Sequence, residues 1–147
     1  MQQYIRFRVG AIIIKDEKLL LVKHKNYPFY YTVGGGIEFG ETSEEAVIRE
    51  IFEELGYKLE IDKLIVVQEN IFILKEEKHH QIVIFYLMKN CDNINIIDGT
   101  NTDETSEKLY WIPIKDLPET NIVPEFLKTK LNKLCSNNKI EHIISYD

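Results

Sequence analysis

The chain has 147 residues, of which 44% are hydrophobic and 11% aromatic, a composition that allows a buried core and excludes an intrinsically disordered chain. Its formal net charge of −6 argues against broad binding to nucleic acids or anionic membranes, which both favour basic surfaces. A small phosphorylated ligand remains compatible with this charge, because a binding site can recruit cations locally.

The chain shows no fixed-period repeat and no linker rich in Pro, Gly or Ser, so we expect residues 1–147 to form one domain. The apolar run at 9–14 is too short for a signal-peptide core or a membrane span. Cys91 and Cys135 follow no disulfide or metal pattern, which favours reduced thiols. These features predict a cytoplasmic protein.

The first part of the chain predicts three strands. Residues 8–14 and 18–25 are apolar runs joined by a polar turn at 15–17, which indicates a hairpin. Residues 30–36 form a third predicted strand that runs directly into a glycine-rich loop.

A helix is predicted over residues 42–57. Thr42 and Glu45 have the spacing of a capping box, and Gly56 stands where a helix C-terminus favours glycine. Apolar residues recur at i, i+4 and i+8 from Val47, as on the buried stripe of an amphipathic helix.

The rest of the chain predicts more strands and a second helix. The predicted elements are strands at 64–74 and 81–88 flanking a charged turn at 75–80, a polar loop at 90–107, a strand at 108–114 and a helix at 123–134 with Pro124 near its first turn. Strands arranged mostly as hairpins, with two helices, predict an α+β fold in which helices cover a mixed sheet.

The glycine loop "GGGIEFGET" at 34–42 has the glycine spacing of a phosphate-binding P-loop, but Glu41 stands where that motif requires lysine. On the following helix, Glu50, Glu53 and Glu54 fall within an arc of about 100°. Such like charges repel, although Arg49 can pair with Glu53 at i+4. Mg²⁺ or Mn²⁺ would relieve the remaining repulsion, since both ions favour carboxylate oxygens. The heptapeptide "REIFEEL" alone is more typical of an ordinary solvated helix face.

The loop and helix together match the pattern G-x5-E-x7-R-E-U-x-E-E-x-G-U, where U is a bulky apolar residue. The matching residues are Gly35, Glu41, Arg49, Glu50, Ile51, Glu53, Glu54 and Gly56. This segment, 35–57, resembles the Nudix box, the signature of the Nudix hydrolase family, and departs from it only at Tyr57, where an aliphatic residue is usual. The resemblance extends over about residues 5–130 through a hairpin before the box and the late segment "WIPIKDL".

The resemblance implies the Nudix fold, an α/β/α sandwich in which a mixed β-sheet is flanked by helices and carries a loop-helix-loop catalytic motif. It also implies Mg²⁺-dependent hydrolysis of the diphosphate linkage in a small nucleoside diphosphate derivative, NDP-X, giving NMP and P-X, with Mn²⁺ able to substitute. A homodimer is common in the family. The implied metal ligands are Glu50, Glu53, Glu54 and Glu41, with backbone oxygen from Gly34 or Gly35.

Within the implied catalytic set, Arg49 orients the carboxylates, and Glu50 and Glu54 are the catalytic glutamates. Glu50 is the candidate for deprotonating water, although in this family that role also falls on residues outside the box.

Residues outside the box are weaker candidates for the site. Related sequences carry an acid after the box where this chain has Gln81, and Glu104 or Glu107 in the long polar loop could replace that acid. Lys23 and Tyr31 are candidate contacts to phosphate and to the base, but exposed loop acids, a strand-end lysine and a core tyrosine are equally ordinary structures.

Three other functions were weighed. A non-catalytic nucleotide-binding sensor with a Nudix fold is the main alternative, although the box retains all its acids. Isomerase chemistry on an isoprenoid diphosphate would require a reactive cysteine, and neither cysteine has an activating context. A dinucleotide-binding site is excluded, because "GGGIEFG" does not give G-x-G-x-x-G within a βαβ unit.

Overall fold

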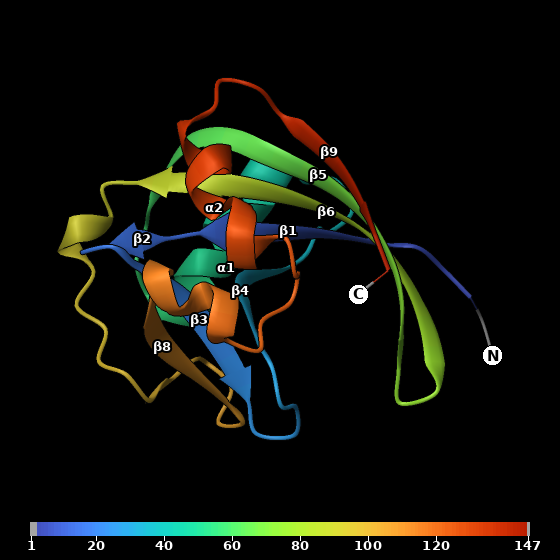
Figure 1. Cartoon of the computed structure of the whole chain (residues 1–147), viewed down its shortest axis with the longest axis horizontal. Helices are drawn as coiled ribbons and strands as arrows, with labels where there is room; N and C mark the ends of the chain where they lie inside the picture. The colour runs from blue at the N-terminus through green and yellow to red at the C-terminus, as the bar shows by residue number, and fades with distance from the viewer. Residues whose placement is uncertain (1–2, 147) are drawn as a thin grey trace.

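The computed structural model describes residues 3–146, and in that part of the chain a mixed sheet of nine strands carries two α-helices (Figure 1). The strands are β1 (Arg6–Ile12), β2 (Ile14–Lys15), β3 (Lys18–His24), β4 (Tyr30–Gly36), β5 (Glu60–Leu74), β6 (Glu77–Lys89), β7 (Thr100–Asn101), β8 (Glu107–Pro113) and β9 (Glu141–Ser145). The helices are α1 (Ser43–Leu55) and α2 (Leu127–Ser136), with short 3-10 helices η1 (Cys91–Asn93) and η2 (Ile114–Glu119). The sheet order is β7-β8-β3-β4-β1-β6-β5-β9, and β2 pairs with β3.

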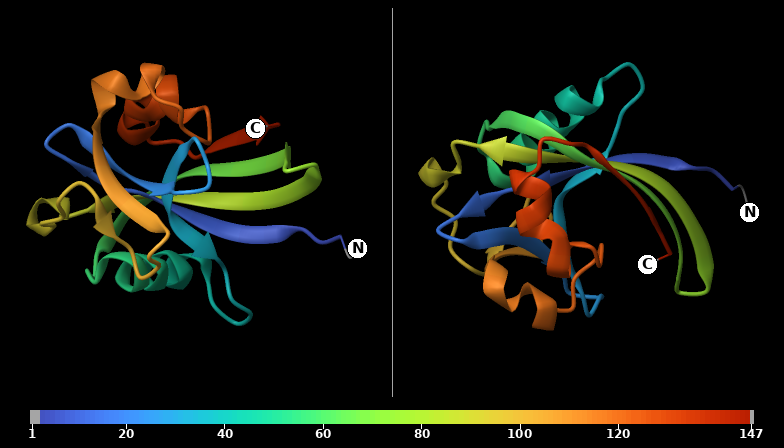
Figure 2. Two further views of the ribbon diagram at one scale, coloured as in Figure 1. Left: turned by 90° about the horizontal axis from the view of Figure 1, so that it is seen from below. Right: turned by 45° about the horizontal axis from the view of Figure 1, so that its top comes forward.

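The two helices cover opposite faces of the sheet, so the α/β/α arrangement is confirmed (Figure 2). One core lies under α1 and contains Ala46, Val47 and Ile51 of that helix together with Val9 and Val33 of the sheet. The second core lies under α2 and contains Leu127, Leu131 and Leu134 together with Val66 and Phe85. Among residues 3–146 there is no helix with both the length and the apolar character that crossing a membrane requires.

Strand β1 lies in the middle of the sheet and places its backbone beside the glycine loop. It pairs antiparallel with β4, with Val9 opposite Gly35, and parallel with β6. Gly35 of β4 lies against Glu50 of α1, and Gly34 lies against Val9 of β1. The helix and strand β1 therefore both contact the glycines of β4.

The predicted hairpin of 8–14 and 18–25 is only partly right. Only β2 and the start of β3 form a tight hairpin, through a turn at Asp16 and Glu17 with φ of 51° and 60°. Strand β1 itself pairs with β4 and β6 instead of β3. Ile12 and Ile13 are fully buried in the two different cores, so this segment is an interior crossing of the molecule and not one arm of a simple hairpin.

Three further predictions required correction. The turn between β5 and β6 consists only of Lys75 and Glu76, both at positive φ, so His79 and His80 lie in strand β6 and not in a turn. Helix α2 begins at Leu127, because residues before it form i to i−3 turns, with the Leu127 amide bonded to the Pro124 carbonyl. The segment 141–145 was not predicted as a strand. It pairs parallel with β5, which is distant in the sequence, so no local pattern indicates this pairing.

The predicted capping box is present. The Thr42 hydroxyl accepts a hydrogen bond from the Glu45 amide at 3.1 Å, and the Glu45 carboxylate accepts one from the Thr42 amide at 2.9 Å. At the other end, Gly56 has φ of 77°, and its amide donates to the Phe52 carbonyl. The helix that carries the acids is therefore fixed at both ends.

We expect Thr42→Ala to lower the free energy of unfolding by about 1 kcal/mol, because the Glu45 amide loses its side-chain acceptor. In a chain of this size that corresponds to a fall in Tm of about 3–4 °C by differential scanning calorimetry. Thr42→Ser keeps the hydroxyl and serves as the matched control. Equal losses in both variants would show that the cap does not stabilise α1.

Candidate active site

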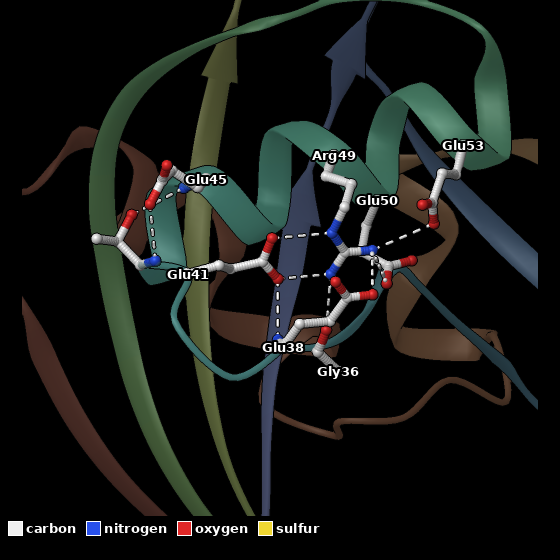
Figure 3. A network of polar contacts seen from close by, with 8 residues as sticks. Gly36, Glu38, Glu41, Glu45, Arg49, Glu50 and Glu53 are labelled. Atoms are coloured by element: carbon white, nitrogen blue, oxygen red, sulfur yellow. Dashed lines mark hydrogen bonds and ion pairs between the residues drawn. The ribbon is translucent and has the colours of Figure 1, made fainter.

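Arg49 lies at the centre of a cluster of carboxylates formed by the glycine loop and helix α1 (Figure 3). Its Nε and Nη2 donate to the two oxygens of Glu41 at 2.9 and 2.6 Å. Its Nη1 donates to Glu50 at 2.9 Å and to Glu53 at 3.2 Å, and Nη2 also donates to the Gly36 carbonyl at 3.0 Å. The Arg49–Glu53 pair predicted from the i,i+4 spacing is present.

The loop acid Glu41 is the acid most firmly paired with Arg49. Its Oε1 also accepts the Glu38 amide at 2.9 Å, which closes the loop before the helix. The hydrogen bonds from Arg49, followed by that from Glu38, lower the pKa of Glu41 to about 2. The same pairing raises the pKa of Arg49. Glu41 is therefore an anion whose charge is already balanced by a neighbouring cation.

Glu50 lies directly against the backbone of Gly35. A Cβ atom on Gly35 would come within 2.4 Å of the Glu50 carboxyl carbon, so no larger residue fits there unless Glu50 moves. The Glu50 side chain is only 15% exposed. Burial raises the pKa of Glu50 more than its bonds to Arg49 lower it. The absence of a side chain at Gly35 thus fixes where this carboxylate lies.

Glu54 is the acid with the most perturbed proton affinity. Burial raises its pKa from an ordinary 4.5 to about 9, and the negative charges of Glu107 and Glu50 add to this. A backbone hydrogen bond at Gly34 opposes the shift, and Asp103 contributes a further like charge. Acids from the box and from the distant loop before β8 therefore meet here, although they are far apart in the sequence.

The structure distinguishes among the candidate acids of the long loop. Glu107, at the start of β8, accepts a short hydrogen bond from the Tyr31 hydroxyl and another from the Thr102 hydroxyl at 3.2 Å. Burial and this contact raise the pKa of Tyr31. Glu107 and Tyr31 thus belong to the acid cluster, whereas the Glu104 side chain is exposed. Asp103 is also exposed, but its charge acts on Glu54; it was missed because no local pattern tells which loop acid lies near the helix.

Two other predicted contacts are not brought to the acids. The ammonium group of Lys23 donates to the carbonyls of Tyr27 and His24, so it is engaged within its own strand-end loop. Gln81 lies in β6 between Arg6 and Asn70. Among residues 3–146, neither side chain makes a hydrogen bond or ion pair with the box acids, so the geometry does not support a phosphate or metal role for Lys23 or Gln81.

Arg8 of β1 is a charged neighbour of the site that the sequence did not single out. It lies opposite Gly36 in the β1–β4 pairing and is partly buried. Burial, followed by the nearby charge of Arg6, lowers the pKa of Arg8, while Glu50 and Glu54 act in the opposite direction. The acid cluster therefore has two arginine neighbours, from a helix and from a strand.

The donor set suits a hard divalent cation, because it consists of carboxylates whose mutual repulsion and burial raise the pKa of Glu50 and Glu54. Over residues 3–146, no three His, Cys, Asp or Glu side chains are already gathered around one point as metal ligands. The reason is visible in Figure 3: Arg49 lies among the carboxylates, and both Glu50 and Glu53 bond to it. Arg49 therefore balances the charge of these carboxylates, and a bound cation would compete with it for them.

Comparison with known proteins agrees with this architecture. The sequence model of the NUDIX domain family matches residues 5–130, and this match covers most of the chain. The protein therefore belongs to the Nudix hydrolase family, as the box residues predicted.

Individual relatives and solved structures are consistent with that membership. An ADP-ribose pyrophosphatase of Methanocaldococcus jannaschii is 41% identical over 131 residues, covering 83% of this chain and 73% of the relative. Diphosphoinositol polyphosphate phosphohydrolase 3-alpha of Mus musculus is 31% identical over 69% of this chain and 58% of its own length. Among solved structures, the mutator MutT protein of Bacillus halodurans has a TM-score of 0.74 at 15% identity, covering 96% of this chain and 90% of its own. A UDP-X diphosphatase has a TM-score of 0.65 at 22% identity, covering 97% and 68%.

The raised pKa of Glu54 predicts a stability that depends on pH in the absence of metal. The unfolded chain releases the Glu54 proton near pH 4.5, whereas the folded protein holds it up to about pH 9, so this group lowers stability as pH rises between those values. Glu54→Gln cannot ionise and removes the penalty. In EDTA, we expect this variant to match the wild-type Tm near pH 5 and to exceed it by about 3 °C or more at pH 8.5.

The matched control for that measurement is Glu44→Gln, which makes the same chemical change on an exposed position of the same helix. It should not change Tm differently at the two pH values. If Glu54→Gln shifted Tm equally at pH 5 and pH 8.5, the ionisation of Glu54 would not be the source of the effect.

The contact between Gly35 and Glu50 predicts that Gly35→Ala weakens metal binding. The added methyl group would displace the Glu50 carboxylate, and disturbing the support of a ligand typically lowers metal affinity by about 10- to 100-fold. Isothermal titration with Mn²⁺ measures this without substrate. Gly36→Ala is the control, since a Cβ atom there meets nothing within 4 Å. Unchanged affinity in Gly35→Ala would remove Glu50 from the ligand set.

Proposed function

We propose that the protein is a Mg²⁺-dependent pyrophosphohydrolase that converts a nucleoside diphosphate derivative, NDP-X, and water into NMP and P-X. The observation that carries this proposal is that the charges of Glu50 and Glu107 both act on Glu54, while Arg49 bonds to Glu50, in a member of the Nudix family. Its relatives named as ADP-ribose pyrophosphatase and UDP-X diphosphatase support cleavage of a diphosphate linkage.

The residues that would hold Mg²⁺ are the helix acids Glu50, Glu53 and Glu54, with backbone oxygen from Gly34 or Gly35. Glu41, which is paired with Arg49, would contribute as an additional acid near them. A bound divalent cation, with Mn²⁺ as a substitute, offsets the charge of the diphosphate and makes an attacking water more acidic.

The protein side chains divide the remaining tasks. Arg49 holds Glu41 and orients the helix acids, since its donors go to carboxylates and to the Gly36 carbonyl. Glu50 and Glu54 are the candidates to accept the proton of the attacking water, since a bound cation would favour the ionised form of both carboxylates over the protonated form that burial favours. Water adds to one phosphorus atom, the bridging P–O bond breaks, and the bridging oxygen leaves on the second phosphate.

Tyr31 and Thr102 serve the same site through Glu107. Their hydroxyl groups donate to the two oxygens of this carboxylate and fix its orientation toward the acid cluster. We propose that Glu107 takes the position of the acid that related sequences carry after the box, where this chain has Gln81.

The environment of the two cysteines favours hydrolysis over isomerase chemistry that would need a reactive thiol. Burial raises the pKa of the Cys91 thiol, and it raises that of Cys135 to about 11. Thiols with raised pKa values are poor nucleophiles and poor proton donors near neutral pH.

ADP-ribose is the first substrate to test, because the relative that aligns over most of this chain is named for it. We propose that the substrate is a small molecule and that the protein is cytoplasmic, with no nucleic-acid or membrane partner. We also propose a homodimer, which light scattering would test.

The proposal predicts that the protein releases AMP and ribose 5-phosphate from ADP-ribose when Mg²⁺ is present. Chromatography measures these products. Other NDP-X compounds, nucleoside triphosphates and dinucleoside polyphosphates form the comparison panel. Glu54→Gln should lower kcat by at least about 100-fold, since proton transfer by a positioned side chain contributes roughly that much. Glu44→Gln should retain wild-type kcat. EDTA should abolish turnover.

A different result would favour the nucleotide-binding sensor. If no compound of the panel is cleaved with either metal, while ADP-ribose still raises the Tm of the protein, the hydrolase proposal is wrong and the acid cluster serves binding alone.

A further inference from the structure

The acid cluster has two arginine neighbours, but only Arg49 is engaged by protein groups. A guanidinium group has five N–H donors. Arg49 makes five hydrogen bonds, two to Glu41 and one each to Glu50, Glu53 and the Gly36 carbonyl. Arg49 therefore has no donor left for a substrate.

Arg8 is in the opposite situation. Among the contacts of residues 3–146 it makes no hydrogen bond and no ion pair, although it is partly buried. Within the same described residues, no buried side-chain nitrogen or oxygen lacks a hydrogen-bond partner, so the Arg8 donors reach space that a ligand or water can enter. A partly buried guanidinium that has no protein partner can therefore make charge-assisted hydrogen bonds to an anion that enters this space.

The position of Arg8 in the sheet places this free cation beside the catalytic loop. Its backbone lies opposite Gly36 of β4 and opposite Val83 of β6, so both neighbouring strands hold it in place. Glu50 and Glu54 act on it electrostatically, and so does Tyr31. These three residues come from the helix and strand that form the proposed site.

We propose that Arg8 is the residue that binds the non-bridging oxygens of the substrate diphosphate. This rests on the proposed function, since it assigns a protein contact to the substrate of that reaction. The planar guanidinium fork can donate two parallel hydrogen bonds to one phosphate group, and its charge adds to that of a bound cation. The carboxylates bind the cation, and Arg8 on β1 provides the positive charge that the protein itself offers to the substrate.

A purely electrostatic role is the competing explanation: Arg8 would only balance the charge of Glu50 and Glu54. The two roles differ in what lysine can restore. Lysine supplies the charge without the fork, so it would fully replace a charge-balancing arginine but only partly replace one that makes two directed bonds.

The test compares Arg8→Gln and Arg8→Lys with the wild type. Arg6→Gln is the matched control, because Arg6 is an exposed arginine of the same strand that bonds to the Tyr4 hydroxyl at 3.1 Å. Titration calorimetry with methylene diphosphonate in Mg²⁺ measures diphosphate binding without turnover. A separate titration with Mn²⁺ alone measures metal affinity, and Tm reports folding.

We expect Arg8→Gln to weaken diphosphonate binding and to lower kcat/KM by about 10- to 100-fold, the range for losing hydrogen bonds to a charged group. Arg8→Lys should recover only part of the loss. Metal affinity should be unchanged or higher, because a nearby positive charge has been removed. Arg6→Gln should bind diphosphonate as the wild type does.

The inference is overturned if folded Arg8→Gln binds diphosphonate with wild-type affinity, or if Arg8→Lys restores it completely. It is also overturned if the wild type does not bind diphosphonate. Failure of the proposed function would appear differently, as a wild-type protein that binds the compounds of the substrate panel but cleaves none of them.

Discussion

The candidate site depends on how closely helix α1 and strand β1 approach the backbone of β4. A Cβ atom on Gly34 would lie 2.1 Å from the Val9 carbonyl oxygen, and one on Gly35 would lie 2.4 Å from the carboxyl carbon of Glu50. Neither position has room for a side chain. Because the glycines let α1 and β1 come close to β4, the Glu50 and Glu54 side chains reach the β4 backbone. Strand β1 also places Arg8 opposite Gly36, next to these acids.

This close packing creates an electrostatic problem that the rest of the site answers. Burial raises the pKa of Glu54, and the like charges of Glu107 and Glu50 add to that shift. Arg49 relieves the charge of the acids nearest the loop, and its donors are used up in doing so. Arg49 does not bond to Glu54, which lies next to Glu107 where the helix meets the loop before β8. A bound cation would therefore stabilise this part of the cluster most.

The parts of this arrangement that could be predicted are those written in local sequence. The spacing of Thr42, Glu45 and Gly56 defined the helix that carries the acids, and the box pattern defined its chemistry. Arg8 and strand β9 were missed because their positions follow from strand pairing between distant segments; Asp103 was missed because no local pattern tells which loop acid lies near the helix. Glu107 and Glu104 were indistinguishable as letters in a polar loop; only the hydroxyl groups of Tyr31 and Thr102 determine that Glu107 turns inward.

Arg49, which precedes Glu50 in helix α1, also explains how the cluster is charge-balanced in the absence of a cation. Arg49 bonds to Glu41 through two donors and to Glu50 and Glu53 through one contact each. A two-point pair is harder to separate than a one-point contact, so an arriving cation would compete first for the helix acids and would leave Glu41 with Arg49. The side-chain exposures single out Glu53, which is 47% exposed, as the first carboxylate that a cation would reach, whereas Glu50 and Glu41 are only 15% and 16% exposed. Arg49 thus acts as an internal counterion that can release the helix carboxylates while it keeps the loop closed.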